Sequence, residues 1–116
     1  MLKWKHSPEK LRWTFQRING LQLAICVAIH FWVSIFKLEW PIRYEGLHAL
    51  LSHPEWLIFY SIFLVLAVYH GFSGLWTIIT DRNPSKTVKK TYKVILIVSG
   101  VLLILLSEWN LILLGQ

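Results

Sequence analysis

The chain has 116 residues, of which 55% are apolar and only 16% are charged, and its mean hydropathy is +0.51. So few charged residues cannot supply the polar surface that a soluble domain of this size needs. The net charge of +6 does not indicate a protein that binds nucleic acid, because the basic residues lie outside the long apolar stretches, where they flank predicted membrane spans. Aromatic residues interleaved with Lys near the N-terminus are typical of a membrane interface. We therefore expect an integral membrane protein.

Three apolar stretches have the length needed to cross a bilayer, which is roughly 20 residues. We expect the spans at about residues 17–37, 55–80 and 92–114, which predicts an all-α integral membrane protein with three transmembrane helices in a single domain. Polar residues interrupt the first span at Asn19, Gln22, His30 and Ser34. The basic, aromatic start of the chain is not typical of a cleavable signal.

Two local features are expected between the spans. A short interfacial helix is predicted around Leu47 to Leu51, and Pro54 is expected in the first turn of the second span, where proline is common. The sequence Asn83-Pro84-Ser85 predicts a turn after that span.

The distribution of Lys and Arg predicts the orientation in the membrane. Five basic residues precede the first span and five follow the second: Lys3, Lys5, Lys10, Arg12 and Arg17, then Arg82, Lys86, Lys89, Lys90 and Lys93. The loop between the first two spans has only Lys37 and Arg43. Because basic residues favour the cytoplasmic side, we expect a cytoplasmic N-terminus and a C-terminus outside.

One stripe of the second span carries residues suited to a cofactor. Asp81 lies eleven positions after His70, and at roughly 100° per residue it returns to within about 20° of the same direction. Gly74 lies on this stripe too. A neutral imidazole is a good axial ligand for haem iron, and a nearby glycine leaves room for a flat macrocycle or a closely packed helix. The alternative is a packed histidine and an ordinary aspartate at a helix end.

The pattern His70-x-x-x-Gly74 followed by Asp81, at the end of the second of three spans, resembles the cytochrome b membrane-anchor subunits of succinate dehydrogenase (complex II). The run from Gly74 to Asp81 is closest to the smaller, hydrophobic anchor subunit. The resemblance implies that His70 ligates the iron of a haem b, with a second His from a partner anchor subunit. It implies that Asp81 lies beside a pocket for ubiquinone or menaquinone. It also implies a bacterial cytoplasmic membrane and docking of iron–sulfur and flavoprotein subunits on the cytoplasmic face.

Two arginines complete the candidate quinone site. In the smaller anchor subunit a Tyr follows the Asp, whereas Arg82 stands here, able to donate to a quinone oxygen or a haem propionate. The run Arg17-Ile18-Asn19-Gly20 resembles an element that enters the first helix of the larger anchor subunit, which makes Arg17 a further candidate. The alternative for Arg17 is a contact with lipid phosphate.

His30 is the alternative haem ligand. Distances measured from Arg17 and Asp81 along the two helices place His30 and His70 at similar depth. Gln16, Asn19 and Cys26 share the face of His30, so we expect that face to pack inward, with His30 either a ligand or a hydrogen-bonded core residue. Glu108 is expected to reach the outer interface or to pair with a partner chain. His6, His48 and His53 are expected to be solvated.

These features predict a membrane-anchor subunit of succinate:quinone oxidoreductase that binds haem b and quinone and docks the catalytic subunits. The chain has no flavin or iron–sulfur motif, so we do not expect it to oxidise succinate alone. Two alternatives stay open. One is a haem-free structural anchor of a fumarate reductase-type complex. The other is a small proton-coupled transporter subunit, with a path through His30, His70 and Glu108.

Overall fold

The computed structural model describes residues 8–116, with side chains from Lys10 onward. Lys3, Lys5 and His6, to which the predictions on orientation and solvation refer, lie outside the described residues. The helices are α1 (Pro8–Phe36), α2 (Tyr44–Leu51), α3 (Pro54–Asp81) and α4 (Lys86–Gly115). Helices α1, α3 and α4 are each long and apolar enough to cross a membrane. The predicted all-α architecture with three spans is confirmed, and the orientation stays a prediction.

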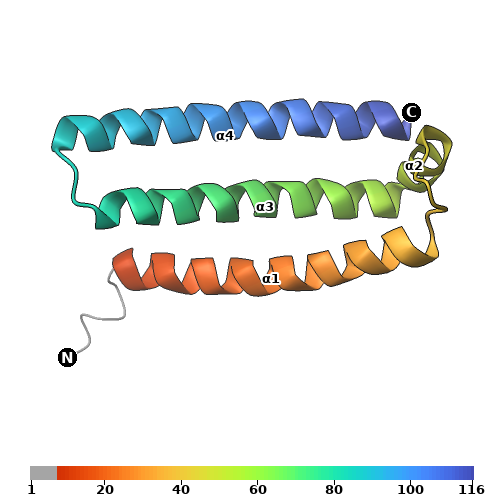
Figure 1. The fold of residues 1–116 in the computed structure, drawn as a ribbon, viewed down its shortest axis with the longest axis horizontal. Coiled ribbons are helices and arrows are strands. Elements are labelled where there is room, and N and C mark those ends of the chain that lie inside the picture. Colours follow the sequence, from red (N-terminus) through yellow and green to blue (C-terminus); the bar gives the residue numbers. More distant parts are fainter. Residues whose placement is uncertain (1–7) are drawn as a thin grey trace.

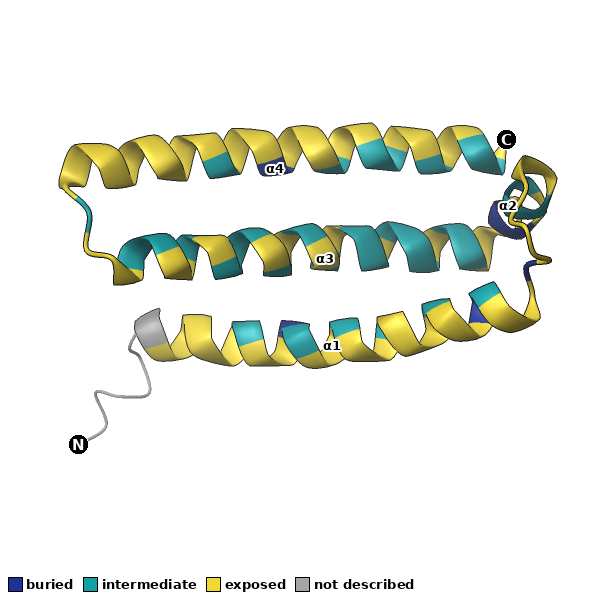
Figure 2. Cartoon of the chain, viewed as in Figure 1, coloured by how far each residue is buried: buried dark blue, intermediate teal, exposed yellow. Residues whose placement is uncertain are grey.

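The three long helices lie side by side in one layer, with α3 between α1 and α4 (Figure 1). Helix α3 packs against both neighbours, whereas α1 and α4 make no packing contact within residues 8–116. Most residues of α1 and α4 are exposed, whereas many residues of α3 are half-buried (Figure 2). Exposed apolar surface this extensive is not stable in water, so lipid or other protein chains must cover it.

The boundaries of α3 and α4 follow from local sequence. Pro54 occupies the first turn of α3, where its missing N–H would have no partner in any case. After α3 ends at Asp81, Asn83 takes a φ of 50°, in the left-handed region that Asn tolerates better than most residues. Ser85 then caps α4, and its side chain accepts a hydrogen bond from the backbone N–H of Val88 at 3.3 Å. The predicted turn at Asn83 is therefore confirmed.

The short helix α2 covers the opposite end of the layer. It packs against α3 and α4, and its Leu50 joins Val33 of α1 and Leu38 in a buried apolar cluster. The predicted short helix is confirmed, and it begins at Tyr44, three residues before the predicted start. Its place at the membrane interface stays a prediction.

His48 corrects the expectation that the histidines outside the spans are solvated. Its Nδ1 donates to the backbone oxygen of Leu114 at 2.7 Å, and the side chain is half-buried. The reason is that α2 folds back over the end of α4, which brings His48 onto carbonyl groups that the helix end leaves without intrahelical partners.

Candidate functional site

His70 lies on the side of α3 that faces α1. A Cβ atom at Gly20 of α1 would lie 3.5 Å from Cε1 of the His70 ring. One turn earlier on α1, Nε2 of Gln16 donates to the backbone oxygen of His70 at 3.4 Å. The ring Nδ1 is buried and has no hydrogen-bond partner among the described residues. Helix α1 therefore holds the imidazole over a glycine while one ring nitrogen is left unpaired.

The backbone of α3 beside His70 is open. An added Cβ atom at either Gly71 or Gly74 would meet no other atom within 4 Å. No helix of this chain packs closely at Gly74 in the described residues, and α1 approaches His70 through Gly20 instead. The opening still fits a flat macrocycle beside the imidazole. No group of three His, Cys, Asp or Glu side chains in the described part of the chain could hold a bare metal ion, and a haem iron needs only axial ligands from protein.

His30 has a different environment. Its Nδ1 lies 3.0 Å from the hydroxyl oxygen of Tyr60, within hydrogen-bonding distance. Its ring centroid is 6.0 Å from that of Phe31 and 5.8 Å from that of Phe63. These contacts support a packed, hydrogen-bonded histidine, and ligation of iron by His30 stays a prediction.

The two histidines do not lie at the same depth, and that expectation is wrong. His70 is opposite Gly20, whereas His30 is opposite Tyr60. Ten residues separate the two levels on each helix, which corresponds to roughly 15 Å along the axis. The reason is that α1 begins at Pro8, so Arg17 does not mark the helix end from which the depth of His30 should be measured.

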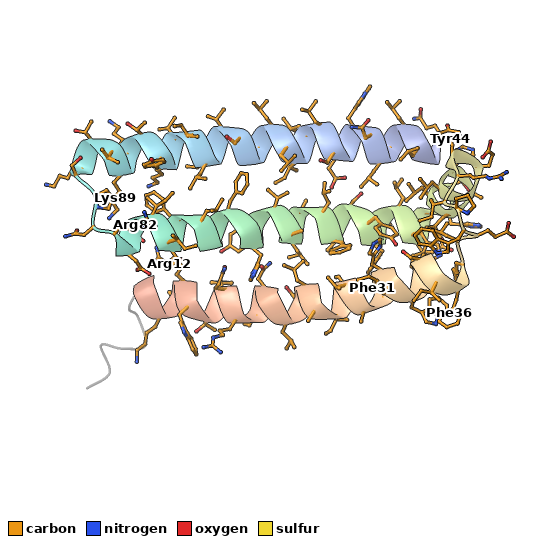
Figure 3. The ribbon with its side chains drawn as sticks, in the orientation of Figure 1. Arg12, Phe31, Phe36, Tyr44, Arg82 and Lys89 are labelled. Carbon is orange, nitrogen blue, oxygen red and sulfur yellow. The ribbon has the colours of Figure 1, made fainter. Side chains whose placement is uncertain are left out.

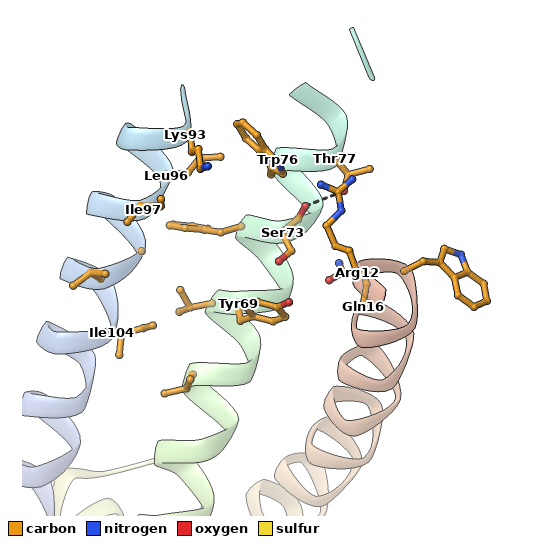
Figure 4. A pocket seen from close by; sticks show the side chains of 16 residues that line it. Arg12, Gln16, Tyr69, Ser73, Trp76, Thr77, Lys93, Leu96, Ile97 and Ile104 are labelled. Atoms are coloured by element: carbon orange, nitrogen blue, oxygen red, sulfur yellow. Dashed lines mark hydrogen bonds between the residues drawn. The ribbon is translucent and has the colours of Figure 1, made fainter. Parts of the chain in front are cut away.

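A pocket of about 650 Å³ lies at the end of the layer where α1 and α4 begin and α3 ends (Figure 4). All three long helices line it. The polar or charged side chains around it are Arg12, Gln16, Ser73, Thr77 and Lys93, and the aromatic ones are Trp13, Tyr69, Phe72 and Trp76. Figure 4 shows Arg12 extending from α1 toward Ser73 and Thr77 of α3.

The polarity of the pocket changes along its length. Thr77 and Lys93 line it near the basic end, whereas Val65 and Ile104 line it toward the middle of the helices. On α3 the lining extends from Val65 to Thr77, which is roughly 18 Å of helix. The pocket thus joins a hydrogen-bonding end to an apolar slot that leads into the membrane region.

Asp81, Arg82 and Arg17 do not line this pocket. Asp81 and Arg82 are exposed at the end of α3, one turn beyond Thr77. Arg17 is also exposed, and its guanidinium carbon lies 4.6 Å from the ring centroid of Trp13. The structure places all three near the basic end but does not bring them together around one cavity.

Sequence reasoning missed the polar residues that do face the pocket. Hydropathy places the first span after Arg12 and Gln16, and so assigns both residues to an interfacial segment. Their separation of four residues, repeated by Ser73 and Thr77 on α3, was the available signal, since residues four apart share a helix face.

Glu108 of α4 was expected to reach the outer interface or to pair with a partner chain. Its Oε1 is buried and has no hydrogen-bond partner within the described residues. Glu108 lies seven residues before the end of α4 at Gly115, roughly 10 Å along the helix. Both expectations for Glu108, contact with the outer interface and pairing with a partner chain, stay predictions.

Comparison with known proteins places the chain in a family. Residues 1–106 match the family model described as succinate dehydrogenase/fumarate reductase transmembrane subunit. A succinate dehydrogenase hydrophobic membrane anchor subunit of Archaeoglobus fulgidus is 32% identical over 75 residues, which cover 65% of this chain and 64% of that protein. Proteins of the same name from Thermoplasma acidophilum and Coxiella burnetii are 30% identical over 91 residues and 34% identical over 77 residues.

The matched segments cover 78% of this chain for the Thermoplasma protein and 66% for the Coxiella protein, and 74% and 65% of those relatives. The chain thus spans slightly less than two thirds of the length of the Archaeoglobus and Coxiella relatives. The family model covers most of the chain, and the resemblance found in the sequence is confirmed. The chain belongs to the family of succinate dehydrogenase and fumarate reductase transmembrane subunits.

Proposed function

We propose that this chain is the hydrophobic membrane-anchor subunit of a succinate:quinone oxidoreductase in the cytoplasmic membrane of a bacterium. The three apolar helices embed it in the bilayer, and the family match and the names of the relatives support the anchoring role. The partners are an iron–sulfur subunit, a flavoprotein subunit and a second membrane-anchor subunit.

The basic end of the layer is the proposed docking side for the soluble subunits. Figure 3 shows Arg12, Arg82 and Lys89 gathered at this end, with Phe31, Phe36 and Tyr44 toward the other. Eight of the ten Lys and Arg residues from Lys10 onward belong to the segments at this end. Basic residues near a membrane surface favour the cytoplasmic side, where subunits that carry flavin and iron–sulfur groups would meet the anchor.

The pocket at this end is the proposed quinone site, and its graded polarity is the observation that carries the proposal. A quinone head group presents two carbonyl oxygens that need hydrogen-bond donors, and its tail needs an apolar path. Arg12 and Lys93 supply charged donors at the basic end, and Ser73 supplies a hydroxyl. The apolar side chains of the inner half, such as Val65 and Ile104, fit the start of an isoprenoid tail.

The aromatic walls would position the flat head group. Tyr69 and Trp76 lie seven residues apart on α3, which places them on nearly the same side of the helix. The aromatic rings on one wall and the hydrogen-bond donors from α1 on another restrict how a planar ligand can lie. A ligand held in one orientation stays in the geometry that electron transfer needs.

His70 is the proposed axial ligand of a haem b, held by α1 through Gly20. When bound, the haem stores and passes single electrons. The open backbone at Gly71 lies about 200° around α3 from Tyr69. Thr77 of the pocket lies seven residues after His70 and therefore on nearly the same side of α3, so the two proposed sites are neighbours on this helix.

The transporter alternative is not favoured by the geometry. The levels of His30 and His70 are roughly 15 Å apart, and Glu108 lies on α4, which α1 does not contact in the described residues. Proton transfer needs groups within hydrogen-bonding distance or joined by water, and α3 lies between α1, which carries His30, and α4, which carries Glu108 (Figure 1).

The proposed function is tested by purifying the complex through a tag on this chain from membranes of its own host. We expect flavin, iron–sulfur clusters and haem b to co-purify, with succinate-driven reduction of a soluble quinone analogue. A preparation with flavin but without a pyridine haemochrome would identify a haem-free structural anchor. A chain that purifies without flavin would contradict the anchor function.

A further inference from the structure

Three buried side-chain atoms in residues 8–116 have no hydrogen-bond partner: Oδ1 of Asn19, Nδ1 of His70 and Oε1 of Glu108. Two of them, on Asn19 and His70, belong to facing helices. Glu108 belongs to α4, which does not contact α1 in the described part of the chain. The unpaired atoms of Asn19 and His70 are therefore considered as a pair, and Glu108 is considered apart from them.

Asn19 lies at the level of His70. Its chain neighbour Gly20 faces the His70 ring, with Nδ1 of the ring 4.0 Å from an added Cβ. Gln16, one turn earlier, donates to the backbone oxygen of His70. Asn19 lies between these two contact residues in sequence, and only 5% of it is exposed. Its side chain is therefore enclosed in the same part of the α1–α3 contact.

The two unpaired atoms are chemically complementary. The Oδ1 of Asn is a hydrogen-bond acceptor, and Nδ1 of a neutral His is a donor in one of its two tautomers. A buried polar atom without a partner is destabilising, because it has lost its hydrogen bonds to water. A single hydrogen bond between these two atoms would give both of them a partner.

We propose that Asn19 is a positioning residue for His70, with Oδ1 of Asn19 accepting a hydrogen bond from the protonated Nδ1 of the imidazole. This bond selects the tautomer that carries its proton on Nδ1 and leaves the lone pair of Nε2 free. It also fixes the rotation of the ring over Gly20. A metal-ligating histidine usually needs such a partner on its other nitrogen, because the partner sets the orientation and basicity of the ring.

The tautomer is a property of this chain alone, whereas its use in holding haem iron rests on the proposed function. The bond explains why a span carries a buried amide where an apolar residue would be less costly. It also assigns different roles to two neighbours, since Gly20 makes room for the ring and Asn19 orients it.

The test is the protonation state of the two His70 ring nitrogens in the full chain, in lipid nanodiscs, with 15N-labelled histidine. The one-bond 15N–1H coupling identifies which nitrogen carries the proton, and the His70→Gln variant assigns the signal. We expect protonated Nδ1 in the wild type, loss of the single tautomer in Asn19→Leu, and its retention in Asn19→Asp, which keeps an acceptor oxygen. Gln22→Leu, an exposed site on the same helix, is the matched control.

Protonation at Nε2 in the wild type, or an unchanged Nδ1–H signal in Asn19→Leu with wild-type helix content, would overturn the proposal. In the purified complex we expect Asn19→Leu to weaken haem retention by about tenfold. A complex that contains no haem contradicts the haem part of the proposed function but leaves the nitrogen signals to decide the role of Asn19. The two failures are therefore distinguishable.

Discussion

Gly20 of α1 lies directly against the imidazole of His70 on α3, where an added Cβ would be 3.5 Å from Cε1 of the ring. A distance of 3.5 Å is ordinary van der Waals contact, so Gly20→Ala should fit with little change. Gly20→Leu places a branched side chain where the ring lies and should displace His70. We expect the haem absorbance of the purified complex to persist in Gly20→Ala and to fall severalfold in Gly20→Leu.

The control for this prediction is Gln22→Leu, because it places a leucine at an exposed position two residues further along the same helix. Normal haem content in Gly20→Leu, with normal yield of the complex, would show that α1 does not position the ring.

Substitution of the two histidines separates their roles. His70→Ala should remove or shift the low-spin haem signal, because it removes the proposed ligand. His30→Ala should keep that signal and lower stability instead, because His30 is hydrogen-bonded to Tyr60. The loss of such a bond within a membrane costs about 0.6–2 kcal/mol. Haem spectra and thermal unfolding in detergent measure the two effects, and a reversed pattern would identify His30 as the ligand.

Gly100 provides a test of the packing between α3 and α4. A Cβ atom there would lie 2.7 Å from Cδ2 and 2.9 Å from Cε2 of Phe72, so Gly100→Ala forces the ring to shift. Overpacking of this kind costs about 1–3 kcal/mol. We expect Gly100→Ala to be less destabilising in a Phe72→Leu background, because a smaller side chain leaves room for the methyl group. Additive losses of thermal stability in the double variant would contradict this contact.

The orientation in the membrane is tested by labelling single cysteines in sealed vesicles of known sidedness. In a Cys26→Ser background, Lys89→Cys should react with an impermeant reagent only from the cytoplasmic side, because basic residues favour that side. Glu45→Cys, in the exposed part of α2, should react only from the outside. Labelling of both positions from the same side would exclude a three-span arrangement.

Apolar length and turn residues were sufficient to predict the three spans, the short helix and the turn at Asn83. The start of α1 was not predictable from hydropathy, because helical structure continues through polar residues beyond the bilayer while hydropathy decreases. Because of that error, Arg12 and Gln16 were not predicted to be helical, and the depth of His30 in the membrane was predicted wrongly. The contact between Gly20 and His70 depends on how α1 and α3 pack against each other, and the pattern within a single helix does not predict that packing.

The motif that ends at Asp81 did not predict which residues line the pocket. Thr77 of the pocket lies on the same side of α3 as His70 and Asp81, but the helix ends at Asp81, one turn beyond the pocket. The place of Asp81 beside a bound quinone stays a prediction. The residues that enclose the cavity come from three helices, and their convergence appears only in the folded chain.

The central claim is that quinone binds in the pocket between α1, α3 and α4, and two arginines on one helix test it most directly. Arg12 extends into the pocket (Figure 4), whereas Arg17 is exposed beside Trp13. Arg12→Gln and Arg17→Gln remove the same charge, so the pair controls for the loss of a basic residue at the membrane surface.

The measurement is succinate-driven reduction of a soluble quinone analogue by the purified complex, compared with reduction of a dye that accepts electrons from the soluble subunits. We expect Arg12→Gln to raise the KM for the quinone analogue about tenfold, the size expected for one lost charge-assisted hydrogen bond, without changing dye reduction. Arg17→Gln should leave both activities at the wild-type level. A wild-type KM in Arg12→Gln together with a raised KM in Arg17→Gln would contradict the assignment of the pocket.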